Sequence, residues 1–245
     1  MAGSFHRDAG WPDAASPHHP TTTMLVSCLM PTRDRRPYIP LAIRSFQNQT
    51  HQEKELLILD DGEDTILDLV PPDPRIHYLR NDCPPWTLGH KLNALAKTAL
   101  GEILCNWDDD DWAAPGRIAY QLAHLTATEK ALTGFNNFHY WDTTANQAYL
   151  WKHPARTFKP PGSTQMYARA WALAHPMRDM TLPVDLHFAT EAHTHGQVTE
   201  QPGIGYLVVR YHQACCWKAT MRNRGYPRVP TTDLPQQFFA DLKEA

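Results

Sequence analysis

In the first half of the chain, short apolar runs alternate with segments that carry one apolar helical face. The runs at residues 25–30, 56–59 and 103–107 have the length of buried strands. Between them, residues 39–46 and 88–99 repeat apolar side chains with the period of an α-helix. Short buried strands that alternate with amphipathic helices predict an α/β fold, in which helices cover both faces of a mostly parallel sheet.

The pattern is weaker in the second half, where we expect a more irregular region. We place strands there at residues 135–141, 148–151, 162–167 and 206–211, and helices at 169–173 and 185–195. The expected organisation is a disordered leader (1–23), a single domain (24–220) with two halves (24–128 and 129–220), and a C-terminal tail (221–245).

Composition excludes several classes of protein. Charged residues make up 20% of the chain and the net charge is −3, so nothing indicates a nucleic acid or an anionic membrane as partner. The apolar runs are too short for a transmembrane segment. The five cysteines are an odd number without CxxC spacing, which is typical of reduced thiols. We therefore expect a cytoplasmic protein.

Four consecutive aspartates, Asp108 to Asp111, follow the apolar run at 103–107. Carboxylates this close repel one another unless a positive partner binds them, and carboxylate oxygens are preferred ligands of Mg²⁺ and Mn²⁺. The ends of strands are also where open α/β sheets bind ligands. A solvated acidic turn is the alternative, but the position favours a metal or metal–substrate site.

Several stretches match one known family in order and spacing. They are residues 26–32, 55–62, 89–93, 99–103 and 107–112, with Pro115, Arg117, Ile118 and Gln121 behind them. On these residues the chain resembles the inverting family 2 glycosyltransferases. The resemblance implies a GT-A fold, with a Rossmann-like central sheet flanked by helices and a more irregular acceptor-side half. It implies transfer of a sugar from a nucleoside diphosphate sugar, UDP-linked by family preference, to an acceptor hydroxyl of a glycan, lipid, protein or small molecule.

The resemblance assigns the acidic run to the DxD motif, which binds Mn²⁺ or Mg²⁺ on the donor diphosphate. Asp108 and Asp110 then occupy the motif, with Asp110 as the direct ligand and the donor ribose as an alternative partner for Asp108. His212, after the late strand, falls where some members present a third ligand. A packed, hydrogen-bonded histidine is the alternative.

The same resemblance implies a nucleotide site in the first half of the chain. Its members are Pro31, Thr32, Arg33, Asp61, Lys91 and Asp108. Asp61 matches the aspartate that accepts a hydrogen bond from the base, although a turn-capping role is also typical before a glycine. Lys91 is the candidate phosphate ligand, because Leu92 replaces a second basic residue of the family pattern. A solvated helix lysine is the alternative for Lys91.

An inverting reaction needs a base that removes the proton of the acceptor hydroxyl. The family places an aspartate at the start of a helix in the second half, and Asp185 corresponds to it. Val184 departs from the family pattern, and Asp185 would otherwise serve as a helix cap. Glu191 is the reserve candidate and Asp179 the third.

Other features allow different interpretations. His187, Glu191 and His195 share one face of the expected helix and would suit zinc, while the role of His193 is open. Four tryptophans would stack on a sugar or pack in the core: Trp141, Trp151, Trp171 and Trp217.

Two other functions also fit parts of the pattern. A metal-dependent nucleotidyltransferase would use the acidic run together with a basic loop, which Arg33, Arg35 and Arg36 partly imitate. A non-catalytic module that binds sugar nucleotides or glycans would explain the departures at Leu92 and Val184.

Overall fold

The computed structural model of the protein describes residues 24–83, 85–153, 157–213, 215 and 225–244. The expected leader (1–23), Trp217 and part of the expected C-terminal tail lie outside this range. Within the described part of the chain, no helix combines the length and the apolar character that are needed to cross a bilayer.

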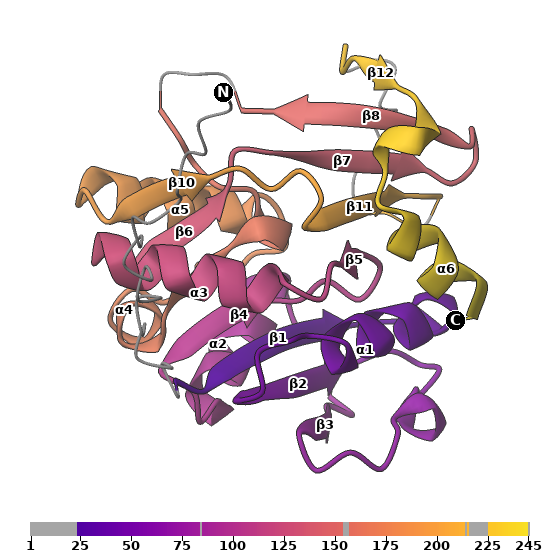
Figure 1. Ribbon diagram of the computed structural model, residues 1–245. Helices are drawn as coiled ribbons and strands as arrows, with labels where there is room; N and C mark the ends of the chain where they lie inside the picture. The colour runs from indigo at the N-terminus through magenta and orange to yellow at the C-terminus, as the bar shows by residue number, and fades with distance from the viewer. Residues whose placement is uncertain (1–23, 84, 154–156, 214, 216–224, 245) are drawn as a thin grey trace, which may run out of the picture.

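A seven-stranded sheet forms the centre of the molecule, in the order β10-β6-β9-β4-β1-β2-β3 (Figure 1). Its strands are β1 (Val26–Thr32), β2 (Lys54–Asp60), β3 (Ile76–Arg80), β4 (Ile103–Asn106), β6 (Leu132–Phe135), β9 (Met166–Ala168) and β10 (Val198–Gln201). Neighbours are parallel except at β9, which runs antiparallel to both β4 and β6. The mostly parallel sheet that the sequence predicts is confirmed.

Helices cover both faces of this sheet, as predicted. They are α1 (Ile39–Gln47), α2 (Leu88–Thr98), α3 (Arg117–Thr128), α4 (Arg169–Ala174) and α5 (Val184–Thr194), while α6 (Gln236–Glu244) packs elsewhere. Side chains alternate across β1, so Cys28 and Met30 pack in the cluster with α1 and α3, whereas Leu29 packs with α2, α4 and α5. The 3₁₀ turns within the described residues are η1 (Arg36–Tyr38), η2 (Leu67–Leu69), η3 (Gly162–Thr164) and η5 (Thr231–Asp233).

A second sheet of five strands lies beside the first, in the order β12-β8-β7-β11-β5. Its strands are β5 (Trp112–Ala113), β7 (Asn137–Asp142), β8 (Gln147–Lys152), β11 (Leu207–Tyr211) and β12 (Arg228–Val229). The predicted single strand at 135–141 is therefore wrong in extent. The chain leaves one sheet and enters the other at Asn136, whose backbone N–H donates to Gln201 and whose carbonyl accepts from His153. The aromatic residues of this segment give both parts strand character and both strands are largely buried, so the sequence pattern does not reveal the change of partner.

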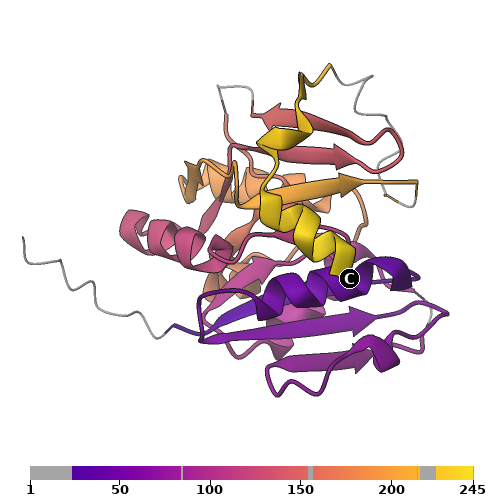
Figure 2. The same cartoon turned by 45° about the vertical axis from the view of Figure 1, so that its right-hand side comes forward.

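Helix α6 lies within the segment that the sequence analysis treats as a tail. It packs across α1 and the edge strand β5 (Figure 2). Phe238 is fully buried against Trp112 and Trp141, and Asp241 accepts a hydrogen bond of 2.8 Å from the indole N–H of Trp112. Because Trp112 follows the acidic run directly, α6 supports the strand in which that run ends.

Truncation of Phe238 tests this support. We expect Phe238→Ala to lower the free energy of unfolding by roughly 3–5 kcal/mol, because a fully buried aromatic ring leaves a cavity. Urea unfolding followed by tryptophan fluorescence measures the loss. Phe239→Ala is the matched control and should cost less, since Phe239 is only half-buried. Equal losses in the two variants would contradict the docking of α6 through Phe238.

Candidate active site

The acidic run connects the two sheets. It follows β4, whose neighbour β1 ends at Thr32, and it leads into β5 of the second sheet. Strands β1, β2 and β4 are parallel, so their carboxyl ends meet at one edge. Asp108 to Asp111 therefore lie at the ligand-binding edge of the central sheet.

Asp109 and Asp111 are buried. Asp109 is hydrogen-bonded to β1 of the central sheet, and Asp111 is hydrogen-bonded to β11 of the second sheet. The Thr32 hydroxyl donates a hydrogen bond of 2.6 Å to Asp109, and the backbone N–H of Arg210 donates one of 3.0 Å to Asp111. Burial, followed by the charge of Asp110, raises the pKa of Asp109 to about 7. The same two causes raise the pKa of Asp111 well above its usual range, and its Oδ2 has no hydrogen-bond partner among the described residues.

Asp110 is the best neutralised of the four carboxylates. Its Oδ2 lies 2.8 Å from Nη1 of Arg35 and 3.0 Å from Nε2 of His212. Burial opposes ionisation, but the hydrogen bond with His212 and the charge of Arg35 hold the pKa of Asp110 below its ordinary value. The ring of His212 stacks on Tyr38 at a centroid distance of 4.0 Å.

Asp108 completes a group of ligand atoms that fits a divalent cation. One carboxylate oxygen from each of Asp108, Asp110 and Asp111 lies within 4.8 Å of the others, and Asp110 also forms such a group with His212 and Cys215. Burial and the neighbouring Asp110 raise the pKa of Asp108 to about 7, so the crowded carboxylates resist full ionisation without a counter-ion. Oxygen donors with one imidazole suit Mg²⁺ or Mn²⁺.

The predicted nucleotide site is only partly assembled. Pro31 and Thr32 end β1, and Thr32 lies close to both Asp61 and Lys91. Arg33 is exposed and pairs with Asp34 at 3.6 Å, so the structure does not bring it to the acidic run.

Lys91 is buried and neutralises Asp61. Its Nζ donates 2.6 Å to Oδ1 of Asp61 and 3.2 Å to the carbonyl of Thr32. Oδ2 of Asp61 accepts a hydrogen bond of 2.8 Å from the backbone N–H of Trp86. Lys91 thus holds the strand-end aspartate in place, which is a different position from the phosphate-facing one that the sequence analysis favours.

A double-mutant cycle tests this pairing. Lys91→Met should lower the free energy of unfolding by roughly 3–5 kcal/mol, because it leaves the buried carboxylate of Asp61 uncompensated. The double variant Lys91→Met/Asp61→Asn should recover part of that loss in urea unfolding. Additive losses in the cycle would show that the two side chains do not interact.

Asp185 lies in the first turn of α5 and reaches toward the acidic run. Its Oδ2 accepts a hydrogen bond of 2.9 Å from the backbone N–H of Gly162. The Gly162 carbonyl in turn accepts one of 3.0 Å from the side chain of Asn106, the last residue of β4. The charge of Asp185 also contributes to the raised pKa of Asp108. These contacts link the predicted base to the metal-binding segment.

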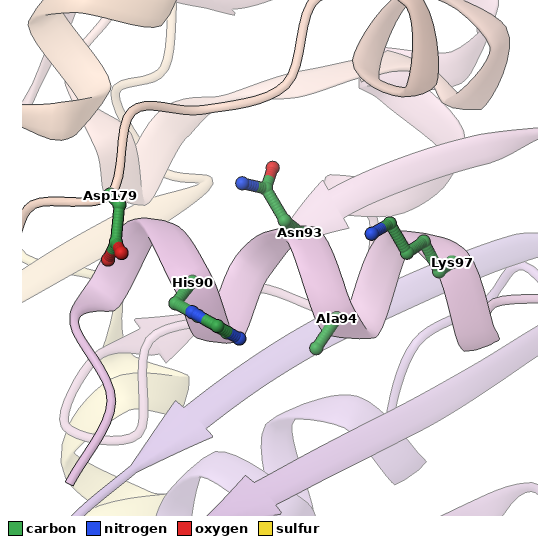
Figure 3. Close-up of a pocket in the computed structure, with 5 residues that line it drawn as sticks. All are labelled: His90, Asn93, Ala94, Lys97 and Asp179. Carbon is green, nitrogen blue, oxygen red and sulfur yellow. The ribbon is translucent and has the colours of Figure 1, made fainter.

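The other predicted bases lie elsewhere. Glu191 is exposed on α5, where its carboxylate lies 2.9 Å from Nδ1 of His175. Asp179 accepts a hydrogen bond from Thr87 and lines a pocket beside α2, together with His90, Asn93, Ala94 and Lys97 (Figure 3). In this pocket, the side-chain amide of Asn93 donates a hydrogen bond to the carbonyl of Met177 and accepts one from the N–H of Met177.

The zinc alternative has no support in the geometry. The clusters of potential metal ligands among the described residues are the two around Asp110, and neither contains His187, Glu191 or His195. His193 is half-buried on the same helix and belongs to neither cluster.

The described tryptophans among the predicted sugar platforms take part in packing. Trp141 contacts Phe238 and Phe239, Trp151 stacks on Phe138 at 4.7 Å, and Trp171 stacks on His175 at 3.8 Å.

Two arginines that the sequence analysis did not assign to this site contact Asp110. Arg35 contacts Asp110, although the sequence analysis considers it only for a triphosphate loop. Arg210 is buried, donates from Nε to the carbonyl of Asp110, and lies over Tyr38 at 5.1 Å. Its position beside Val208 and Val209 in an apolar strand was the available signal, because a charge in such a strand needs a partner.

The family model for "Glycosyl transferase family 2" matches residues 27–185, well over half of the chain. The chain belongs to this family. Family 2 relatives include the putative colanic acid biosynthesis glycosyl transferase WcaA of Escherichia coli, 33% identical over 105 residues, which are 41% of this chain and 37% of the relative. A second is the GalNAc(5)-diNAcBac-PP-undecaprenol beta-1,3-glucosyltransferase of Campylobacter jejuni, 32% identical over 116 residues, which are 45% of this chain and 35% of the relative. The chain thus spans little more than a third of each relative.

Solved structures of low sequence identity share the fold of this family 2 member. TarS of S. aureus, residues 1–349 in complex with UDP, aligns with a TM-score of 0.64 and 16% identity over 77% of this chain and 61% of that chain. The mannosyltransferase PcManGT of Pyrobaculum calidifontis, in complex with GDP-Man and Mn²⁺, aligns with a TM-score of 0.59 and 16% identity. The alignment covers 77% of this chain and 56% of that chain. The predicted GT-A fold is confirmed.

Proposed function

We propose that this family 2 protein is a metal-dependent, inverting glycosyltransferase, which moves a sugar from a UDP-sugar to an acceptor hydroxyl. The observation that carries the proposal is the meeting of Asp108, Asp110 and His212 with Asp185 at the carboxyl edge of the central sheet. An inverting transfer needs the diphosphate of the donor and the base that activates the acceptor on opposite sides of one anomeric carbon. Asp108, Asp110 and His212 would hold the metal that binds the diphosphate, and Asp185 would be the base.

Asp108, Asp110 and His212 would hold Mn²⁺ or Mg²⁺. The fit rests on the crowded carboxylate oxygens and on the buried Oδ2 of Asp111, which has no hydrogen-bond partner among the described residues. When bound, such an ion neutralises the charge that develops on a leaving diphosphate. The Thr32 hydroxyl and the Arg210 backbone keep the run fixed, so its carboxylates do not have to reorganise.

The nucleotide would lie over the ends of β1 and β2, against Pro31, Thr32 and Asp61. Asp61 already accepts hydrogen bonds from Lys91 and from the Trp86 N–H. Each carboxylate oxygen has a second lone pair, so Asp61 retains the capacity to accept a hydrogen bond from the base. UDP is supported by the TarS structures, in which that protein binds UDP or UDP-GlcNAc.

Asp185 would act as the base. It would take the proton of the acceptor hydroxyl while the hydroxyl oxygen forms a bond to the anomeric carbon and the bond from that carbon to the diphosphate breaks. The products are a glycosylated acceptor of inverted configuration, a nucleoside diphosphate and a protonated Asp185. The N–H of Gly162 orients the carboxylate before the reaction.

The metal site is tested by calorimetric titration with UDP, with and without Mn²⁺. The wild type should bind UDP only when Mn²⁺ is present. Asp110→Asn should weaken this binding by at least about 10–100-fold, because it removes the charge of a proposed ligand. Asp64→Asn is the matched control and should behave as the wild type, because Asp64 is exposed and pairs with Arg36 at the surface. Metal-dependent binding of UDP that persists in Asp110→Asn would remove Asp110 from the site.

The base is tested separately from donor binding. Asp185→Asn should bind UDP and Mn²⁺ like the wild type, but release of UDP from UDP-sugars in an acceptor panel should fall by roughly 10²–10⁴-fold. Glu191→Gln is the control on the same helix and should retain transfer, since Glu191 faces His175. If Glu191→Gln loses transfer and Asp185→Asn keeps it, Asp185 is not the base.

We place the protein in the cytoplasm. The support is chemical: the described cysteines Cys28, Cys83, Cys105 and Cys215 are free thiols, which suits a reducing compartment.

A further inference from the structure

The guanidinium of Arg35 lies among the proposed metal ligands. Its Nη1 is 2.8 Å from Oδ2 of Asp110 and 3.3 Å from Nε2 of His212, and these last two atoms are themselves 3.0 Å apart. The side chains are largely shielded from solvent, with relative exposures of 13% for Arg35, 15% for Asp110 and 4% for His212. Arg35 thus provides a positive charge in contact with the atoms that a metal ion would use.

A guanidinium and a divalent cation cannot occupy this position together. Both would need Oδ2 of Asp110 and Nε2 of His212, and two cations at contact distance repel strongly in a partly buried site. Arg35 is permanently protonated, so it cannot relieve the repulsion by losing its charge. A metal ion that binds Asp110 and His212 therefore has to displace Arg35.

The surrounding contacts allow the Arg35 side chain to move while the site stays assembled. Arg35 immediately precedes η1, and Tyr38 at the end of that turn stacks on His212. The Arg210 guanidinium lies over the Tyr38 ring at 5.1 Å, and its Nε donates a hydrogen bond to the backbone carbonyl of Asp110. The Arg35 guanidinium also lies over the Tyr38 ring, at 5.9 Å. The stacking of Tyr38 on His212 and the Arg210 hydrogen bond to the Asp110 carbonyl do not pass through Arg35, so they remain available when its guanidinium moves.

We propose that Arg35 is a placeholder cation, which neutralises Asp110 until metal and donor arrive together. The inference rests on the proposed metal and nucleotide-diphosphate site. A diphosphate offers the displaced guanidinium a new anionic partner, because arginine binds phosphate oxygens in charge-assisted hydrogen bonds. UDP should then raise the affinity for Mn²⁺, and by thermodynamic reciprocity Mn²⁺ should raise the affinity for UDP.

Titration of the wild type and Arg35→Met with Mn²⁺ tests the placeholder. Free Mn²⁺, followed by its electron paramagnetic resonance signal, reports binding without turnover. In the absence of UDP, Arg35→Met should bind Mn²⁺ at least about 10-fold more tightly than the wild type, because no resident cation competes. Arg36→Met is the matched control: Arg36 pairs with Asp64 and Asp68 at the surface, and its removal should leave Mn²⁺ binding unchanged.

A second substitution and a stability measurement guard against misfolding. Arg35→Lys keeps a positive charge on the same segment and should bind Mn²⁺ alone more weakly than Arg35→Met. Thermal unfolding should show that Mn²⁺ without UDP stabilises Arg35→Met more than the wild type, since Asp110 has lost its resident partner.

The outcomes separate this inference from the proposed function. Equal affinities of the wild type and Arg35→Met for Mn²⁺ alone, with UDP-dependent binding intact, would overturn the placeholder and leave the metal-dependent transferase standing. Absence of Mn²⁺ binding to both proteins, with or without UDP, would overturn the placeholder and the metal site together.

Discussion

Neutralisation of four adjacent carboxylates is the constraint on which the rest of this structure depends. Asp108 to Asp111 are partly or fully buried, and burial raises the pKa of three of them. The fold meets this demand unevenly. Among the described residues, Asp110 is bonded to Arg35 and His212, whereas Asp109 accepts only from the Thr32 hydroxyl and Asp111 only from the backbone N–H of Arg210. The remaining excess of negative charge is what a bound divalent cation would balance.

The same run joins the two sheets, so the site and the architecture depend on each other. It leaves the central sheet after β4 and enters the second sheet as β5, which pairs with β11 and is covered by α6. Strand β11 returns Arg210 and His212 to the run from a distance of about one hundred residues in sequence. On the other side, Asn106 and Gly162 connect the end of β4 to Asp185. A displacement of either sheet would therefore change the spacing between the proposed metal site and the proposed base.

The sequence predicted elements well where local pattern and final environment agree. Strands β1, β2 and β4 are apolar on both sides because helices cover both faces, and such runs have few other interpretations. Prediction failed where one segment with strand character contributes to two different sheets. Residues 135–141 have strand character throughout, but Asn136 divides them between two sheets. The docking of α6 was also missed, since its apolar face has meaning only against Trp112 and Trp141.

By itself the sequence determined the α/β class, the family and the acidic run at a strand end, because periodicity and motif spacing are local properties. Only the tertiary structure decided which charges meet. Lys91 pairs with Asp61, and Arg35 pairs with Asp110 across 75 positions of the chain. A lysine in a helix and an arginine in a loop have many possible partners in sequence. The close packing of the folded chain selects among them, since a buried charge is stable only beside the group that neutralises it.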